Sequence, residues 1–183
     1  MPNYTLKFFA LIIFIFPSLS YSCGDNPNAI IQGPFEDNSF RNGYICFQNT
    51  SDKREIEFHH SYTTNDGVRD YVADTFSYSD APAELMSVFF ASVGKRRNVI
   101  VLLRWNVNYE NKGIQYPYYY EIKSYQNNDG RGYELNLSSE KDTQLSGYQI
   151  KKDGKVVNYR LDSAKKIKQY LIEKYSSSQL TGK

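Results

Sequence analysis

The chain has 183 residues and a formal net charge of +2, with 22 basic and 20 acidic side chains. This near balance excludes the strongly basic composition of nucleic-acid-binding domains, and a hydrophobic fraction of 40% excludes wholesale disorder. Seventeen tyrosines and eleven phenylalanines raise the aromatic share to 16%, which favours sheet surfaces and protein-binding faces but names no reaction.

The N-terminus has the features of a secretory signal peptide over residues 1–22. Lys7 precedes the apolar run Phe8–Phe16, and Ser20-Tyr21-Ser22 fits the small-x-small pattern of a cleavage site. The run is shorter than the roughly 20 residues that span a bilayer. We therefore expect an exported mature chain that starts at Cys23 and has no transmembrane segment. The periplasm is the expected compartment, or the exterior in a Gram-positive or eukaryotic host.

The two cysteines, Cys23 and Cys46, most simply form a disulfide in an exported protein. The bond would close a loop of about 24 residues and contribute roughly 3 kcal/mol through the unfolded state. A lipid anchor on Cys23 is the alternative. It would leave Cys46 without a partner, and bulky Tyr21 departs from the lipoprotein pattern.

The first third of the mature chain predicts an extended arm followed by strands. The arm covers residues 23–42, which are rich in Gly, Pro and Asn. Strands are expected at Gly43–Phe47 and Glu55–His59, the second because polar and apolar residues alternate. Asn65-Asp66-Gly67 is a turn signal and leads into a further strand at Val68–Tyr78.

A buried helix is predicted after this strand. Ser79-Asp80-Ala81-Pro82 has the residues of a helix start. The segment Ala83–Val93 that follows is apolar on most sides, and Gly94 supplies an end. We expect this helix to be buried against the sheet.

The strongest strand signal lies at Asn98–Tyr109. Its first half, Val99–Leu103, is apolar at every position, as in a central strand that is covered on both faces. In its second half polar and apolar residues alternate, so one face is expected to contact solvent. The turn Asn111-Lys112-Gly113 connects it to a returning strand at Pro117–Tyr125.

The last third predicts two hairpins and a closing helix. Asn127–Gly130 is a hairpin turn before a strand at Tyr133–Leu137. A second hairpin joins Gly147–Ile150 to Val156–Leu161. An amphipathic helix follows from Ser163 to about Tyr175.

Together these elements predict a single α+β domain over residues 23–175, followed by a frayed tail at 176–183. The expected fold is a twisted antiparallel sheet of about six to eight strands with one buried central helix and one C-terminal amphipathic helix.

The sequence contains few groups that could form a catalytic or metal site. His59 and His60 are adjacent on a predicted strand, so they point to opposite faces and cannot chelate one metal ion together. No nucleophile elbow, zinc-protease motif or phosphate-binding glycine loop occurs. We therefore expect no catalytic residue, no metal and no cofactor.

A pair of carboxylates would suffice for a glycan-cleaving enzyme, and the chain offers several candidates. Glu55, Glu57, Glu121 and Glu134 alternate with apolar residues, as on the solvated face of a strand, so a binding protein is the favoured interpretation. The candidates are Glu55, Glu57, Asp66, Asp70, Asp74, Glu110, Glu121 and Glu134.

The tyrosine-rich stretch Tyr116–Tyr120 suggests an interaction surface. Neighbours on a strand face opposite sides, so Tyr118 and Tyr120 cannot share a face with Tyr119. One side must be core, and the other places tyrosines at the surface. Exposed tyrosine beside Asn and Arg is the composition of a partner-binding patch. A sheet merely covered by tyrosines is the alternative.

The segments Asn98–Trp105 and Tyr119–Tyr125 form a strand pair that resembles those of small exported bacterial proteins. With the signal peptide and the single disulfide, the chain resembles periplasmic immunity proteins, which guard bacteria against effectors of contact-dependent, type VI-like secretion. The resemblance covers about thirty residues and implies a protein that plugs a toxin's active cleft. The contacts that it implies are Arg104, Trp105, Tyr109, Glu110, Tyr116, Tyr118, Asn128, Asp129 and Arg131.

We therefore expect an exported binding protein, not an enzyme, that neutralises a cognate toxin or effector enzyme by forming a stoichiometric complex. Nucleic acid is not an expected partner. Two alternatives remain open. One is a small cell-envelope hydrolase that acts on peptidoglycan or polysaccharide through two carboxylates, and the other is a structural or adhesive envelope protein.

Overall fold

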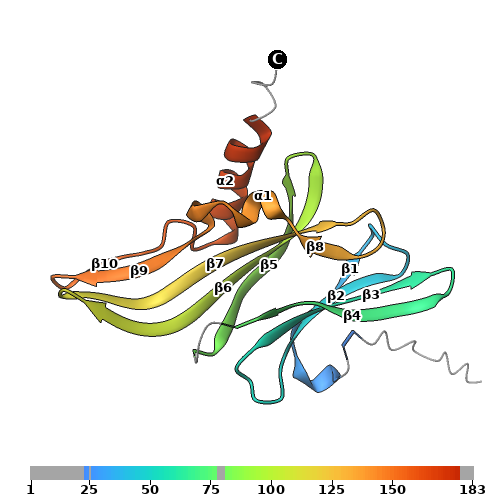
Figure 1. The fold of residues 1–183 in the computed structure, drawn as a ribbon, viewed down its shortest axis with the longest axis horizontal. Coiled ribbons are helices and arrows are strands. Elements are labelled where there is room, and N and C mark those ends of the chain that lie inside the picture. Colours follow the sequence, from blue (N-terminus) through green and yellow to red (C-terminus); the bar gives the residue numbers. More distant parts are fainter. Residues whose placement is uncertain (1–22, 25, 78–80, 178–183) are drawn as a thin grey trace, which may run out of the picture.

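The computed structural model describes residues 23–24, 26–77 and 81–177 (Figure 1). The predicted signal peptide at 1–22 and residues 178–183 of the predicted tail lie outside the described residues. Residues 176 and 177 of that tail belong to the last helix.

Within the described residues, ten strands form two antiparallel sheets. The small sheet has the order β1-β2-β3-β4, so each strand pairs with its neighbour in the chain. Its strands are β1 (Ile30–Asp37), β2 (Gly43–Asn49), β3 (Ile56–Thr64) and β4 (Gly67–Phe76). A single 3-10 turn, η1 (Pro27–Ala29), precedes β1.

The large sheet has the order β10-β9-β7-β6-β5, and β8 pairs with the far end of β7. Its strands are β5 (Ala83–Val93), β6 (Arg96–Asn111), β7 (Ile114–Asn127), β8 (Tyr133–Leu135), β9 (Ser146–Lys152) and β10 (Lys155–Val157). The helical segments are α1 (Leu137–Glu140), η2 (Thr143–Leu145) and α2 (Ala164–Ser177).

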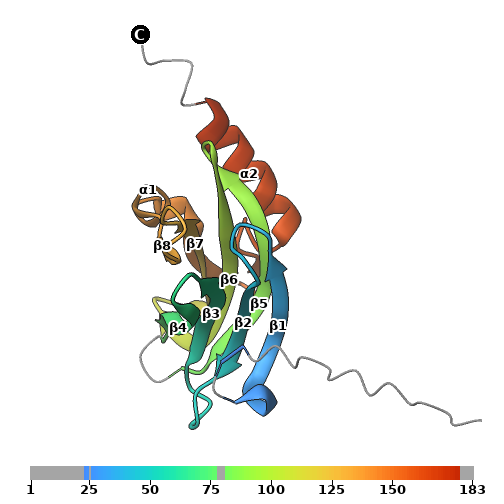
Figure 2. The ribbon, with the colours of Figure 1, turned by 90° about the vertical axis from the view of Figure 1, so that its right-hand side faces the viewer.

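The large sheet is the middle of three layers, between the small sheet and α2 (Figures 1 and 2). Successive residues of β6 show why. Val101 and Leu103 face the small sheet and belong to the core between the two sheets. Ile100 and Leu102 face the other way and belong to a second core, together with Ile167 of α2. The prediction that this strand is covered on both faces is confirmed.

The predicted buried helix at Ala83–Val93 is wrong, because this segment is strand β5, paired with β6 from Ala83–Trp105 to Val93–Arg96. Val88 and Phe90 pack against the core between the sheets, and Phe89 packs against the core beneath α2. A segment that is apolar on all sides fits a two-faced strand as well as a buried helix. Here the β-branched and aromatic residues favour the strand.

The prediction of one sheet is also wrong, although a mainly antiparallel α+β architecture is present. Most of the expected strands exist, but they divide between two sheets after β4. Alternation shows that a strand is half-buried and does not show which sheet it joins. The strand expected up to Leu137 ends at Leu135, since Asn136 caps α1 by accepting from the Ser138 backbone N–H.

The C-terminal helix, expected from Ser163 to about Tyr175, is α2. Ile167 and Leu171 are fully buried against the large sheet. Farther along, Lys174 and Tyr170 reach the carboxylate of Asp142, which lies just before η2. These contacts fix the helix to one half of the large sheet.

The predicted disulfide is confirmed, because Cys23 is bonded to Cys46 and their Cα atoms lie 6.0 Å apart. Within the stretch expected to be an extended arm, Ile30–Asp37 forms the edge strand β1 of the small sheet. The start of the arm lies on the outer face of β2. A Cβ atom added at Gly24, whose φ is +76°, would meet the side chain of Gln48.

Candidate functional site

The large sheet continues past the small sheet at one end (Figure 1). We call this extension the wing. It comprises residues 106–118 of the β6–β7 hairpin and residues 148–157 of the β9–β10 hairpin. One of its two surfaces continues the inner face of the large sheet, which elsewhere packs against β1–β4.

A continuous row of aromatic rings runs along that surface. Trp105 contacts Tyr119 with ring centroids 5.9 Å apart, and Tyr119 contacts Tyr148 at 4.9 Å. Tyr148 then contacts Tyr116 at 5.3 Å, and Tyr116 contacts Tyr109 at 5.5 Å. We call the four tyrosines the tyrosine face.

Strand register places these rings on one side of the sheet. Trp105 pairs directly with Tyr119, and Tyr119 pairs with Tyr148. Directly paired residues of antiparallel strands share a face. Tyr109 pairs with Tyr116 beyond a register shift in β6 and another in β7, and these shifts keep both rings on the same side.

Exposure rises along the row. Trp105 is fully buried, whereas Tyr148 is 41% and Tyr109 is 53% exposed. A row that begins in the core therefore ends on an open surface. At this end of the row Asn108 has a φ of +41°, and a hollow of about 180 Å³ is lined by Asn108, Tyr109, Glu110, Gln115 and Pro117.

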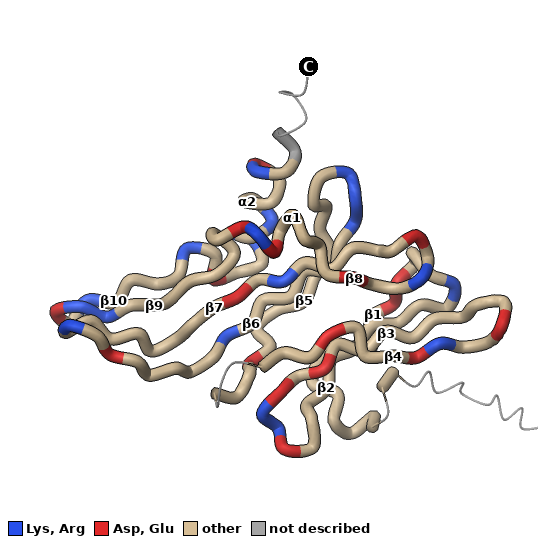
Figure 3. The backbone as a smooth tube through the Cα atoms, viewed as in Figure 1, with Lys and Arg blue, Asp and Glu red and all other residues tan. Residues whose placement is uncertain are grey.

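The tip of the wing is charged. Figure 3 shows blue Lys segments gathered there, with shorter acidic segments among them. The charged residues are Glu110, Lys112, Lys151, Lys152, Asp153 and Lys155, and all of them are exposed.

The structure brings together only part of the predicted contact set. Tyr109 and Tyr116 lie on one side of the wing, and Glu110, which pairs with Gln115, lies on its other side. Trp105 requires a correction, because it is 0% exposed and lies in the core between the sheets, where a surface partner cannot reach it. Polar and apolar residues alternate around Trp105 in the sequence. This alternation does not show that the small sheet extends far enough to cover Trp105.

Arg104 and Tyr118 lie on the opposite face of the large sheet. The Arg104 guanidinium is 4.5 Å from the centroid of the Tyr118 ring and pairs with Glu84. Tyr118 packs against the core beneath α2. These two residues therefore belong to a different surface from the tyrosine face.

Asn128, Asp129 and Arg131 lie in the turn between β7 and β8, at the end of β7 away from the wing. These three residues therefore do not belong to the same surface as the tyrosine face.

Tyr148 of β9 belongs to the site, although the sequence did not predict it as a contact. The sequence does indicate that Tyr148 shares one face of a hairpin strand with Ile150 and Lys152. It does not show that this face joins Tyr119, because the pairing of β9 with β7 includes a register shift.

His59 and His60 point to opposite faces of the small sheet, as predicted from their adjacency. The Nε2 atom of His59 lies 2.9 Å from Glu57 Oε2 and 2.5 Å from Gln48 Nε2. Hydrogen bonding to His59 holds the pKa of Glu57 below its usual range. Glu57 Oε2 also accepts from Gln48 Nε2 at 3.2 Å, so this carboxylate joins the two side chains on the outer face of β2 and β3.

His60 lies on the inner face, at one end of the core. The rings of Phe40, Tyr62 and Tyr133 surround it, with centroids 4.4 Å, 4.8 Å and 5.0 Å away. Its Nδ1 lies 3.2 Å from the hydroxyl of Tyr71, and its Nε2 is buried without a hydrogen-bond partner. Burial lowers the pKa of His60 to about 4, against the opposing effect of the Asp37 carboxylate.

We expect acid to destabilise the protein through His60. The unfolded chain binds a proton near pH 6.5 and the folded chain only near pH 4, so stability present above pH 6.5 is lost as pH falls between these values. From pH 7 to pH 5 the loss attributable to His60 is about 2 kcal/mol. Urea denaturation at both pH values measures it.

The matched variant is His60→Phe, which removes the titrating group and keeps a ring in the aromatic cluster. Its free energy of unfolding should fall by about 2 kcal/mol less than that of the wild type between the two pH values. Equal losses in the two proteins would show that His60 does not govern the acid response.

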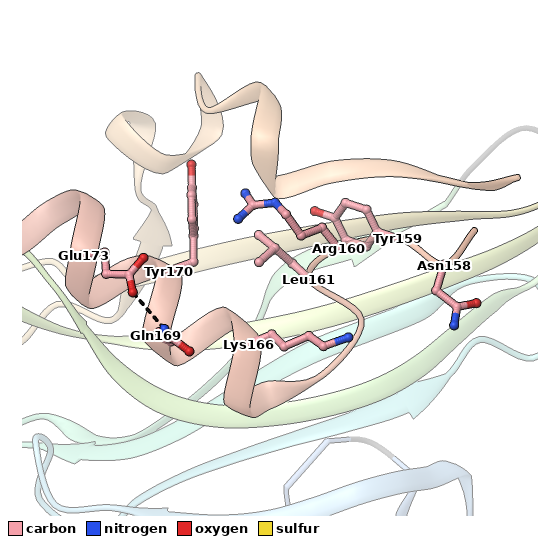
Figure 4. Close-up of a pocket in the computed structure, with 8 residues that line it drawn as sticks. All are labelled: Asn158, Tyr159, Arg160, Leu161, Lys166, Gln169, Tyr170 and Glu173. Carbon is pink, nitrogen blue, oxygen red and sulfur yellow. Dashed lines mark hydrogen bonds between the residues drawn. The ribbon is translucent and has the colours of Figure 1, made fainter.

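Four hollows on the surface each contain one carboxylate. The hollow beside α2 has a volume of about 370 Å³ and is lined by eight residues that Figure 4 labels. Its carboxylate, Glu173, accepts a hydrogen bond from Gln169 at 2.8 Å. Three further hollows contain Glu57, Asp129 and Glu110 respectively. A glycosidase needs two carboxyl groups at the scissile bond.

In the described part of the chain, no group of three or more His, Cys, Asp or Glu side chains is placed to hold a metal ion. No helix among the same residues is long and apolar enough to cross a membrane. Comparison with known proteins finds no matching family model, no matching curated protein and no matching solved structure.

Proposed function

We propose that this chain is an exported binding protein that neutralises a cognate toxin or enzyme by forming a stoichiometric complex through the tyrosine face. The observation that carries the proposal is the row of rings that leaves the core at Trp105, passes through half-buried tyrosines and ends at the exposed Tyr148 and Tyr109 on the wing. Tyrosine is enriched among the residues that dominate binding energy, because it buries a large area and retains a hydroxyl.

Two further features support this function. The tyrosine face continues the inner face of the large sheet but lacks the cover that β1–β4 provide elsewhere, so a partner would complete the layer. Beside these tyrosines, the same side of the wing carries the pair Ile150 and Val157, and Val157 is 57% exposed. The disulfide fits a chain that acts in an oxidising compartment outside the cytoplasm.

The test uses tagged mature protein starting at Cys23 to capture its partner from cell-envelope extract and secreted material. We expect a one-to-one complex with a protein whose hydrolytic or pore-forming activity the complex silences. The triple variant Tyr109→Ala, Tyr116→Ala and Tyr148→Ala should bind at least about thirtyfold more weakly, as for a surface that contains binding hot spots. Isothermal titration calorimetry measures both affinities.

Phe35→Ala is the matched control, because Phe35 is an aromatic residue of β1 that is 36% exposed and lies outside the wing. It should bind like the wild type. Unchanged affinity in the triple variant would contradict the proposal. Turnover of cell-wall or glycan fragments by the purified protein alone would support the hydrolase instead.

A further inference from the structure

The tip of the wing carries an excess of positive charge next to the tyrosine face. Four lysines stand there against two carboxylates, a formal excess of two charges that equals the formal net charge of the whole chain. Other basic residues gather elsewhere, at Lys95–Arg97 and along α2, so the wing is one of several basic regions and is distinguished by the tyrosines beside it. The charged residues of the tip are Lys112, Lys151, Lys152, Lys155, Glu110 and Asp153.

Two of these lysines share the face that carries the tyrosines. Along β9, Tyr148, Ile150 and Lys152 alternate and thus lie on one side of the sheet. Lys152 pairs directly with Lys155 of β10, so Lys155 lies on that side as well. The two ammonium groups therefore border the apolar surface instead of lying behind it.

Neither lysine pairs with a carboxylate of the described residues. Among the described residues, Lys152 and Lys155 make no ion pair and no side-chain hydrogen bond, although Asp153 lies between them in the sequence. Elsewhere lysines do find carboxylates: Lys166 pairs with Asp162 at 2.8 Å, and Lys174 pairs with Asp142 at 2.6 Å. The wing thus presents two adjacent cations that lack a counter-charge.

We propose that the tyrosine face binds a protein with an acidic surface, and that Lys152 and Lys155 pair with its carboxylates at the rim of the contact. The inference rests on the proposed function and adds the chemistry of the partner. Aromatic residues at the centre with charges at the rim are the usual anatomy of a protein interface. Complementary rim charge raises the rate of association and selects against partners of the wrong sign.

The same charges argue against two other occupants. A second copy of the chain, packed face to face with the two wing tips alongside each other, would bring Lys152 and Lys155 close to their own counterparts, and like charges oppose such a contact. Anionic membrane surfaces are typically bound by clusters of four to eight basic residues beside a membrane segment or on an amphipathic helix. The tyrosine face instead lies on a sheet, and of the four lysines of the wing only Lys152 and Lys155 are on its side.

The test with a defined probe follows the backbone amide NMR signals of the mature chain. The probe is a peptide of alternating Glu and Leu, and the comparison peptide has Lys in place of Glu. We expect the acidic peptide to shift signals of residues 107–118 and 148–157, with an affinity that falls from 20 to 300 mM NaCl as screening increases. The basic peptide should leave these signals unchanged.

Two double variants with the same change in net charge separate the wing from general attraction. Lys152→Glu with Lys155→Glu should weaken binding of the acidic peptide at least tenfold at 20 mM NaCl. Lys165→Glu with Lys168→Glu, on the exposed side of α2, should change it by less than twofold. Equal losses in the two variants, or equal binding of the two peptides, would overturn the inference.

Vesicles of phosphatidylglycerol and phosphatidylcholine provide a third probe. Stronger binding of the wing to these vesicles than to the acidic peptide would also overturn the inference.

The triple tyrosine variant and the Lys152 and Lys155 variant are then measured on the captured complex. If the triple tyrosine variant loses affinity and the Lys152 and Lys155 variant does not, the acidic partner is wrong while the proposed function stands. If neither variant loses affinity, both fail.

Discussion

Replacing Trp105 by alanine is expected to lower the free energy of unfolding by about 4 kcal/mol, the usual cost of removing a large aromatic side chain from a core. Trp105 is fully buried between the two sheets and contacts Tyr119, the first ring of the tyrosine face. The variant should therefore lose both core packing and the support of the exposed rings. Urea denaturation followed by circular dichroism measures the loss.

Tyr109→Ala is the matched control, because Tyr109 lies on the same strand and at the exposed end of the same row of rings. Its loss of stability should stay below about 1 kcal/mol, as for most surface substitutions. Equal losses at Trp105 and Tyr109 would mean that the row is not divided into a core part and a surface part.

Removing the disulfide is expected to cost about 3 kcal/mol, since the bond closes a loop across a sequence separation of 23 residues. Both cysteines are buried, and the arm that begins at Cys23 lies against Gln48 on the outer face of the small sheet. The variant Cys23→Ser with Cys46→Ser should therefore unfold at a lower urea concentration with a similar slope.

Reduction of the wild type by dithiothreitol provides the control. It should bring the unfolding midpoint of the wild type to that of the double variant and leave the double variant unchanged. If the double variant is as stable as the oxidised wild type, the arm is held by its other contacts alone.

Local patterns predicted most strands and the last helix well. Alternation at Glu55–His59 and the turn at Asn65–Gly67 correspond to β3, its turn and β4. The unbroken apolar run Val99–Leu103 correctly indicated cover on both faces. These features depend on a residue's own periodicity and on short turns, which are visible in a single sequence.

The errors arose where tertiary context decides. The segment Ala83–Val93 is apolar on most sides, which fits a buried helix as well as a two-faced strand, and its pairing with β6 decides for the strand. Trp105 was expected at the surface, and this expectation was wrong because no local pattern shows how far the small sheet extends along β6. Tyr148 was missed because its place beside Tyr119 depends on the register between β9 and β7. Pairing across a sheet is a non-local property.

The most direct measurement is site-specific photo-crosslinking from the tyrosine face. Benzoylphenylalanine replaces Tyr109 in one sample of the mature protein and Phe35 in another, and both are irradiated in cell-envelope extract and secreted material. We expect one crosslinked protein from position 109 and none from position 35, since only position 109 lies on the wing. Crosslinks to that protein from position 35 alone would place the binding surface on the small sheet and contradict the assignment of the tyrosine face.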